Sequence, residues 1–65
     1  MSNIILKTAR EKAGLTQVEV AKKAGITEYS YQRIEYGKQT PSLHTALAIA
    51  KSVNSTVEEL FSKLT

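Results

Sequence analysis

The sequence has no cysteine and only one histidine among its 65 residues. A chain without cysteine cannot form a disulfide, and one histidine does not supply the ligands of a structural zinc site. The length allows a single domain over residues 1–65, which buries only about 60% of the surface that the unfolded chain exposes. We therefore expect close helix packing, self-association or both to stabilise this domain, without a metal or another cofactor.

Long apolar runs and catalytic groups are also scarce. No run approaches the roughly 18 apolar residues of a membrane span, and the apolar residues 4–6 are too few for a signal peptide. The six carboxylates are scattered, and His44 has no obvious partner that would orient it as a catalytic base. These absences predict a soluble, cytoplasmic protein that is not an enzyme and has no membrane partner. They also predict no evident small-molecule effector, and His44 as a surface residue.

The charge is unevenly distributed. Nine Lys and Arg against six Asp and Glu give a net charge of +3 and an isoelectric point of about 9.4. Seven basic and four acidic residues lie in residues 1–38, whereas residues 39–65 carry two of each. The excess in the first part of the chain favours an anionic partner such as nucleic acid, although a slightly basic solvated surface has the same composition.

Helix ends are marked along the whole chain. Residues that readily adopt the left-handed conformation of a helix C-terminus recur at Gly14, Gly25, Gly37 and Asn54. Capping boxes, in which an N-cap side chain and a glutamate satisfy two backbone amides, are indicated at residues 16–19 and 55–58. Together with apolar residues at helical spacing, these signals predict five helices at residues 3–13, 17–24, 28–36, 43–53 and 56–64.

The predicted fold is all-α, a compact five-helix bundle, because no stretch alternates with period two long enough to suggest a sheet. In the fourth helix we expect Leu43, Leu47, Ala50 and Val53 to form the buried face, flanked by Ala46 and Ile49. Only residues 25–27 separate the second and third helices, and such a short turn beginning with glycine indicates a helix-turn-helix. An ordinary helical hairpin is the alternative.

Four stretches carry a resemblance to a known family: REKAGLTQ at residues 10–17, VAKKAGI at 20–26, IEYGK at 34–38 and PSL at 41–43. They resemble the lambda-repressor-like DNA-binding domains of the Cro/C1-type helix-turn-helix (XRE) family, and the similarity extends over essentially the whole chain. The resemblance implies a domain that binds double-stranded operator DNA as a homodimer and regulates transcription.

In such a domain the third helix lies in the major groove. The resemblance implies base contacts by Glu28, Tyr29 and Arg33, and helical phase adds Gln32 to them. Arg33 is expected to contact guanine O6 and N7, with a phosphate contact or a solvated charge as the alternative. Glu28 either accepts from cytosine N4 or is a surface residue that the helix dipole favours. Tyr29 packs on a thymine methyl, bonds a phosphate, or is merely exposed.

The same resemblance implies that other residues contact DNA phosphates or stabilise the fold. The candidates for phosphate contact are Gln17, Ser30, Lys38, Tyr36, Gln39 and Arg10. Arg10 has mainly a structural role, because the family often pairs its position with that of Glu35 in a largely buried salt bridge.

A homodimer is expected because one recognition helix reads only a few base pairs, whereas two related by symmetry read two half-sites. The expected interface consists of Val53, Asn54, Ser55, Leu60, Phe61 and Leu64. In the alternative, the apolar members of this set close the core of one chain. The leading functional hypothesis is a sequence-specific transcriptional regulator that represses by binding a symmetric operator. An antitoxin, a restriction–modification controller and a protein-interaction module are the alternatives.

Overall fold

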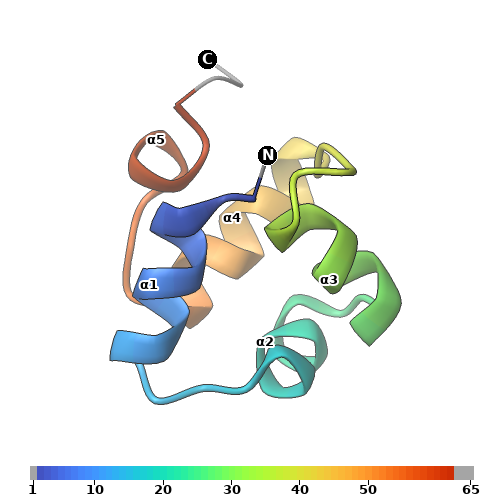
Figure 1. The fold of residues 1–65 in the computed structure, drawn as a ribbon, viewed down its shortest axis with the longest axis horizontal. Coiled ribbons are helices and arrows are strands. Elements are labelled where there is room, and N and C mark those ends of the chain that lie inside the picture. The colour runs from blue at the N-terminus through green and yellow to red at the C-terminus, as the bar shows by residue number, and fades with distance from the viewer. Residues whose placement is uncertain (1, 63–65) are drawn as a thin grey trace.

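The computed structural model describes residues 2–62, and over that range it has five α-helices and no strand (Figure 1). The helices are α1 (Ile4–Lys12), α2 (Gln17–Ala24), α3 (Glu28–Glu35), α4 (Leu43–Ser52) and α5 (Val57–Leu60). The predicted all-α class and helix order are confirmed. Within this range no helix has the length and apolar character that a membrane span requires.

The helices begin at side chains that accept hydrogen bonds from otherwise unpaired backbone amides. Thr16 caps α2 with the complete capping box: its Oγ1 accepts from the Glu19 amide at 3.1 Å, and Glu19 Oε1 accepts from the Thr16 amide at 2.8 Å. The side chains of Thr27 and Ser42 cap α3 and α4 by accepting from the amides of Ser30 and Thr45, without the reciprocal bond. The residues predicted to end helices, Gly14, Gly25, Gly37 and Asn54, all have positive φ.

The last helix differs from the prediction at both ends. Its cap is Thr56, one residue later than predicted, and the Thr56 Oγ1 accepts from the Glu59 amide at 3.1 Å. The predicted capping box is not formed, because Glu59 Oε1 accepts from the Thr56 hydroxyl at 3.2 Å and not from the Thr56 backbone amide. The helix ends at Leu60 instead of continuing to residue 64, because Phe61 leaves the helical conformation and turns into the core (7% exposed). The Leu60 carbonyl accepts a hydrogen bond from Asn3 Nδ2 at 2.9 Å in place of an intrahelical partner.

The face that α4 buries also differs from the prediction. Leu43 and Leu47, expected in the core, are 70% and 50% exposed, whereas the residues expected to flank them, Ala46 and Ile49, are fully buried. The buried face of α4 packs chiefly against α2. Small side chains at a helix crossing let two backbones approach closely, which favours the alanine-rich face over the leucine-rich one.

One core unites all five helices. It is formed by Leu6, Val20, Ala21, Tyr31, Ile34, Ala46, Ile49, Ala50, Val53, Leu60 and Phe61. Figure 1 shows α2 and α3 meeting at a short turn on the opposite side of the molecule from α1 and α5, with α4 behind them. The inner side of α3 is thereby fixed against the core, and its outer side is left toward solvent.

Candidate nucleic-acid interface

The turn between α2 and α3 sets the position of the candidate recognition helix. Gly25 has φ of 73°, a left-handed conformation that strains any residue with a Cβ atom. The amide of Ile26 then donates to the Ala21 carbonyl at 3.0 Å, which closes the end of α2 and directs the chain into α3. The contact between α2 and α3 has the arrangement of a helix-turn-helix.

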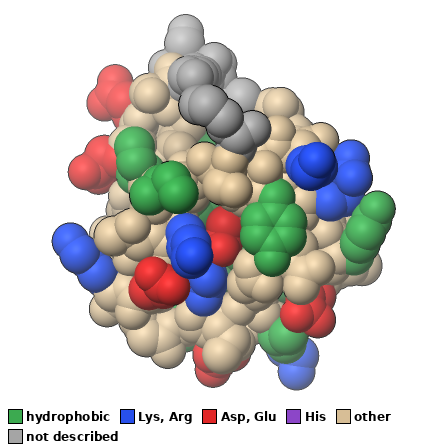
Figure 2. Space-filling view, in the orientation of Figure 1, with side chains coloured by type: hydrophobic (Ala, Val, Ile, Leu, Met, Phe, Trp, Pro, Cys, Tyr) green, Lys and Arg blue, Asp and Glu red, His purple; other side chains and the backbone are tan. Residues whose placement is uncertain are grey.

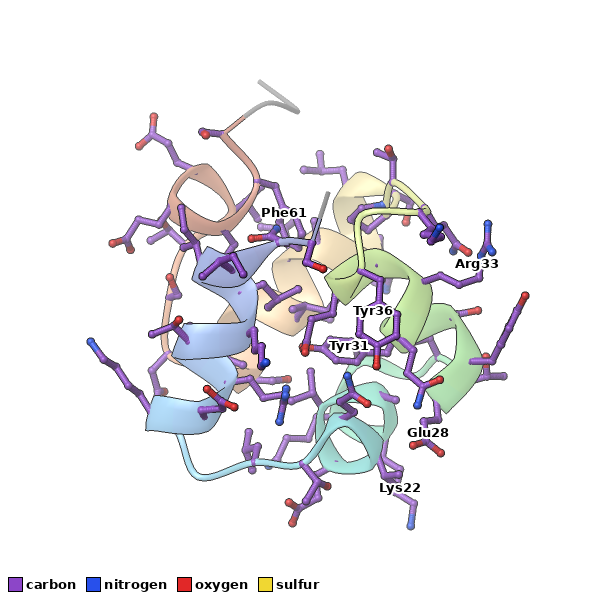
Figure 3. All side chains as sticks on the ribbon, in the orientation of Figure 1. Lys22, Glu28, Tyr31, Arg33, Tyr36 and Phe61 are labelled. Carbon is purple, nitrogen blue, oxygen red and sulfur yellow. The ribbon has the colours of Figure 1, made fainter. Side chains whose placement is uncertain are left out.

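Helix α3 has one buried and one accessible side. Tyr31, Ile34 and Glu35 are buried, whereas Glu28 and Tyr29 are exposed and Gln32 and Arg33 are half-buried. The four residues predicted to face bases therefore lie away from the core, as their helical phase required. In Figure 3, Arg33 and Glu28 point outward from opposite ends of α3, while Tyr31 points toward the middle of the molecule.

The guanidinium of Arg33 is held in place by three neighbours. Its Nε donates to Gln39 Oε1 and its Nη2 donates to the Lys38 carbonyl, each at 3.2 Å, and its central carbon lies 5.7 Å from the centroid of the Tyr29 ring. Gln39, predicted to contact a phosphate, thus bonds Arg33 in this structure. The remaining N–H groups of Arg33 can still bind an acceptor outside the protein.

Glu28, Gln32 and Gln17 form a second polar group on the same side. Gln32 Nε2 donates to Glu28 Oε2 and to Gln17 Oε1, both at 3.3 Å. Gln17 is the first residue of α2, and its own Nε2 donates to Glu35 Oε1 at 3.2 Å. The side chain of Gln17, predicted to contact a phosphate, therefore also connects the surface to a buried carboxylate.

That carboxylate belongs to the expected salt bridge between Arg10 and Glu35, which is present. Arg10 Nε lies 2.8 Å from Glu35 Oε2, and Arg10 Nη2 donates to Glu35 Oε1 at 3.1 Å. The hydroxyl of Tyr31 donates to Glu35 Oε2 at 2.6 Å. Arg10 Nη1 donates to the Leu15 carbonyl, and the Arg10 side chain is only 12% exposed, which favours its structural role over a phosphate contact.

The electrostatics of this network follow from its hydrogen bonds. Burial alone raises the pKa of the Glu35 carboxyl, but hydrogen bonds from Arg10, Tyr31 and Gln17 outweigh burial and hold that pKa below its ordinary value. Burial and then the hydrogen bond to Glu35 raise the pKa of Tyr31, and the hydrogen bond with Glu35 raises the pKa of Arg10. Glu35 is thus a buried ion that can only accept hydrogen bonds.

The remaining phosphate candidates lie around the outer side of α3. Lys38 and Tyr36 are exposed just after the helix, and Ser30 is half-buried in its first turn. Figure 2 shows Lys and Arg side chains together at the edge of the molecule where α3 meets the following loop. A polar helix surface with basic groups beside it has the composition of a surface that binds nucleic acid.

The predicted dimer interface requires a correction. Val53, Leu60 and Phe61 are buried within a single chain, so they close its core, as the alternative interpretation held. Asn54 is exposed and Ser55 is half-buried, and their part in an interface stays a prediction. Leu64 lies outside the described residues.

Sequence reasoning missed the capping role of Asn3 and the bond between Gln39 and Arg33. Asn3 caps α1 and also donates to α5, and Gln39 orients Arg33. An asparagine before an apolar run is an N-cap signal that could have identified the first of these roles. No local pattern marks the second, because Gln39 approaches Arg33 only through the path of the α3–α4 loop.

Comparisons with known proteins agree with this geometry. The model of a family described as helix-turn-helix matches residues 6–60. A protein of Archaeoglobus fulgidus is 41% identical over 56 residues, covering 86% of this chain and 80% of that protein. A protein of Methanocaldococcus jannaschii has the same identity over 56 residues and 85% of its own length. One of Methanothermobacter thermautotrophicus is 33% identical over 58 residues, 88% of this chain and 84% of its own. Each is described as an uncharacterised HTH-type transcriptional regulator.

Proposed function

The chain belongs to the Cro/C1-type (XRE) helix-turn-helix family of DNA-binding transcriptional regulators, and from this we propose that it is a repressor. It binds a symmetric operator as a homodimer, with α3 of each copy in the major groove. The observation that carries this proposal is the two-sided character of α3: Tyr31 and Ile34 fix it to the core, and Glu28 and Arg33 are presented to solvent. A helix docked in this way fits the major groove, where side-chain donors and acceptors distinguish base pairs.

Phosphate contacts position α3 in the groove. The amides at the start of α2, beside Gln17, form with the helix dipole a site suited to a phosphate. Lys38 supplies a positive charge from the loop after α3, and Ser30 supplies a hydroxyl from its first turn. These groups lie around the same accessible side of the helix-turn-helix, and each would add affinity that does not depend on base sequence.

The homodimer uses the exposed leucines of α4. Leu43 and Leu47 are one helical turn apart, so they lie on the same face of the helix. Leu43 follows directly after the loop that carries Lys38 and Gln39, so a second copy seated there stands beside the reading surface. Two leucines cover far less than the roughly 800 Å² per partner of a stable interface, so the pairing forms on DNA and not in the free protein.

Selection of bound duplexes from a random pool, followed by titration in salt, tests this function. We expect a recovered site with two-fold symmetry. With about six to eight phosphate contacts per dimer, log affinity falls with log salt concentration at a slope of about −5 to −7. A slope near zero, or indifference to every duplex, would contradict DNA binding and favour a protein-interaction module.

Arg33→Ala separates base reading from general attraction. We expect a loss of about 1–3 kcal/mol confined to duplexes that retain one particular guanine in each half-site. Lys7→Ala is the matched control, because Lys7 is an exposed cation on a different helix, α1. It should leave the base preference unchanged. If Arg33→Ala weakens all duplexes equally, Arg33 contacts a phosphate.

A further inference from the structure

The direction of the hydrogen bonds that begin at Glu35 determines what α3 presents to solvent. An ionised carboxylate only accepts, so Gln17 must turn its amide nitrogen toward Glu35, with Nε2 3.2 Å from Oε1. The other end of the same amide, Gln17 Oε1, is thereby directed to Gln32. It accepts from Gln32 Nε2 at 3.3 Å. A buried charge thus sets the orientation of an amide at the surface.

The hydrogen bonds of Gln32 determine which end of its side-chain amide faces solvent. Its Nε2 carries two hydrogens, one donated to Gln17 Oε1 and the other to Glu28 Oε2. Both donors of Gln32 are used within the protein, so the group that it can offer to a base is its carbonyl oxygen, an acceptor. Although glutamine side chains often read adenine with a donor and an acceptor together, this one lacks an unused donor.

Glu28 adds acceptors of its own beside Gln32. Its carboxylate receives only the one Gln32 hydrogen in this pair and retains lone pairs directed outward. As the first residue of α3, Glu28 lies where the helix dipole favours a negative charge, which offsets repulsion from phosphates. The Gln32 hydrogen bond fixes the position of the carboxylate one helical turn away.

Arg33 has the opposite character. Its guanidinium only donates, and Gln39 Oε1 and the Lys38 carbonyl hold it above the Tyr29 ring. The accessible side of α3 is therefore divided into an acceptor half and a donor half. In the major groove, guanine N7 and O6 are acceptors, whereas cytosine N4 and adenine N6 are donors.

We propose that Glu28 and Gln32 act as one acceptor pair that reads an exocyclic amino group, cytosine N4 or adenine N6, in each half-site, while Arg33 reads a guanine. Gln17 and Glu35 are positioning residues for this pair. This inference rests on the proposed function, and it limits the operator to half-sites in which an amino-bearing base stands beside the contacted guanine.

Single-group changes in the duplex test the proposal. In the selected site, the base facing the pair is replaced by an analogue without its amino group, a 2-pyrimidinone for cytosine or an unsubstituted purine for adenine. Loss of the amino group should lower the affinity of the unaltered protein roughly tenfold, and the analogue that has this effect identifies the base. The variants Glu28→Ala and Gln32→Met should bind the normal and the analogue duplex equally.

A control variant and the guanine preference of Arg33 distinguish failure of the acceptor pair from failure of DNA binding. Glu11→Gln removes one exposed negative charge from α1 and should discriminate between the duplexes as the unaltered protein does. If Glu28→Ala and Gln32→Met still discriminate, or if neither analogue lowers the affinity of the unaltered protein, the acceptor pair is wrong. The DNA-binding function stands in that case as long as Arg33→Ala still loses its guanine preference. A protein that prefers no duplex at all overturns both. Circular dichroism verifies that each variant is folded.

Discussion

Glu35 keeps a negative charge inside the protein because Arg10, Tyr31 and Gln17 all donate hydrogen bonds to it. An ion removed from water in this way contributes little net stability when it is paired, but it is costly when its partner is lost. The same residue fixes the direction of the Gln17 amide. One buried group therefore affects both the stability of the fold and the pattern of donors and acceptors on the surface.

The stability of the protein should fall in acid because of this residue. The folded pKa of Glu35 is lower than that of the unfolded chain, about 4.3. Its contribution is therefore fully present above the unfolded pKa and is lost as the pH falls through the folded value. Arg10→Met should cost about 3–5 kcal/mol at neutral pH, because it leaves the carboxylate buried without its cation.

In Arg10→Met the pH dependence should reverse. Burial then raises the pKa of Glu35, so acid neutralises the unpaired charge and the deficit relative to the unaltered protein shrinks toward pH 4. Thermal melting between pH 3 and pH 7 measures this difference, with the exposed Lys12→Met as the charge-matched control. A deficit that is the same at every pH would show that the Glu35 charge is not its cause.

At the residue scale, the sequence predicts the roles of residues that belong to a motif. It does not predict roles that depend on how segments distant in the sequence pack together. The Arg10–Glu35 pair and the outward set on α3 follow from family positions and helical phase, and both agree with the structure. The bond that Gln32 donates to Gln17 depends on how α2 crosses α3, and the bond that Arg33 donates to Gln39 depends on the α3–α4 loop. Neither geometry is encoded in a local pattern.

Among the elements, the buried face of α4 and the length of α5 could not be predicted from the spacing of apolar residues. Helix α4 is apolar on more than one face, so spacing alone could not decide between Leu43 with Leu47 and Ala46 with Ile49. The choice depends on which face fits closely against α2. The length of α5 was overestimated because its apolar spacing continues beyond Leu60, although a helical turn there would take Phe61 out of the core.

Asn3 links the ends of three helices. Substitutions of Asn3 should separate the contributions of its two side-chain hydrogen bonds to the free energy of unfolding. Its Oδ1 accepts from the Leu6 amide at the start of α1, and its Nδ2 donates to Leu60 at the end of α5. Its backbone amide donates to the Glu35 carbonyl at 2.7 Å, which any substitution except proline retains.

Asn3→Ser keeps a capping oxygen but cannot reach Leu60, so we expect a loss of about 1 kcal/mol. Asn3→Ala removes both side-chain bonds and should cost about 2 kcal/mol. Urea unfolding measures both values, and Ser2→Ala is a control at the neighbouring exposed position. If Asn3→Ser unfolds like the unaltered protein, the bond to α5 contributes nothing and the α5 end is held by Phe61 alone.

Considered as a whole molecule, the chain has two accessible surfaces to which the proposed function assigns different partners. The polar side of α3 suits the edges of base pairs, and the leucines of α4 suit an apolar contact. The loop between α3 and α4 connects the two surfaces directly along the chain. A small apolar contact adds little affinity in free solution, but two copies held on one duplex are at a high effective concentration.

Cooperative binding of two copies to DNA would reveal the apolar contact at α4. We expect a monomer in sedimentation of the free protein and two cooperatively bound copies on the full symmetric site. Leu47→Lys should reduce cooperativity on the full site roughly tenfold while leaving affinity for an isolated half-site unchanged, since burial of a leucine contributes about 1.5–3 kcal/mol. Ile5→Lys is the matched control, because Ile5 is similarly exposed but lies on α1. Equal loss on half-site and full site would instead place Leu47 against the DNA, and loss with Ile5→Lys alone would move the contact to α1.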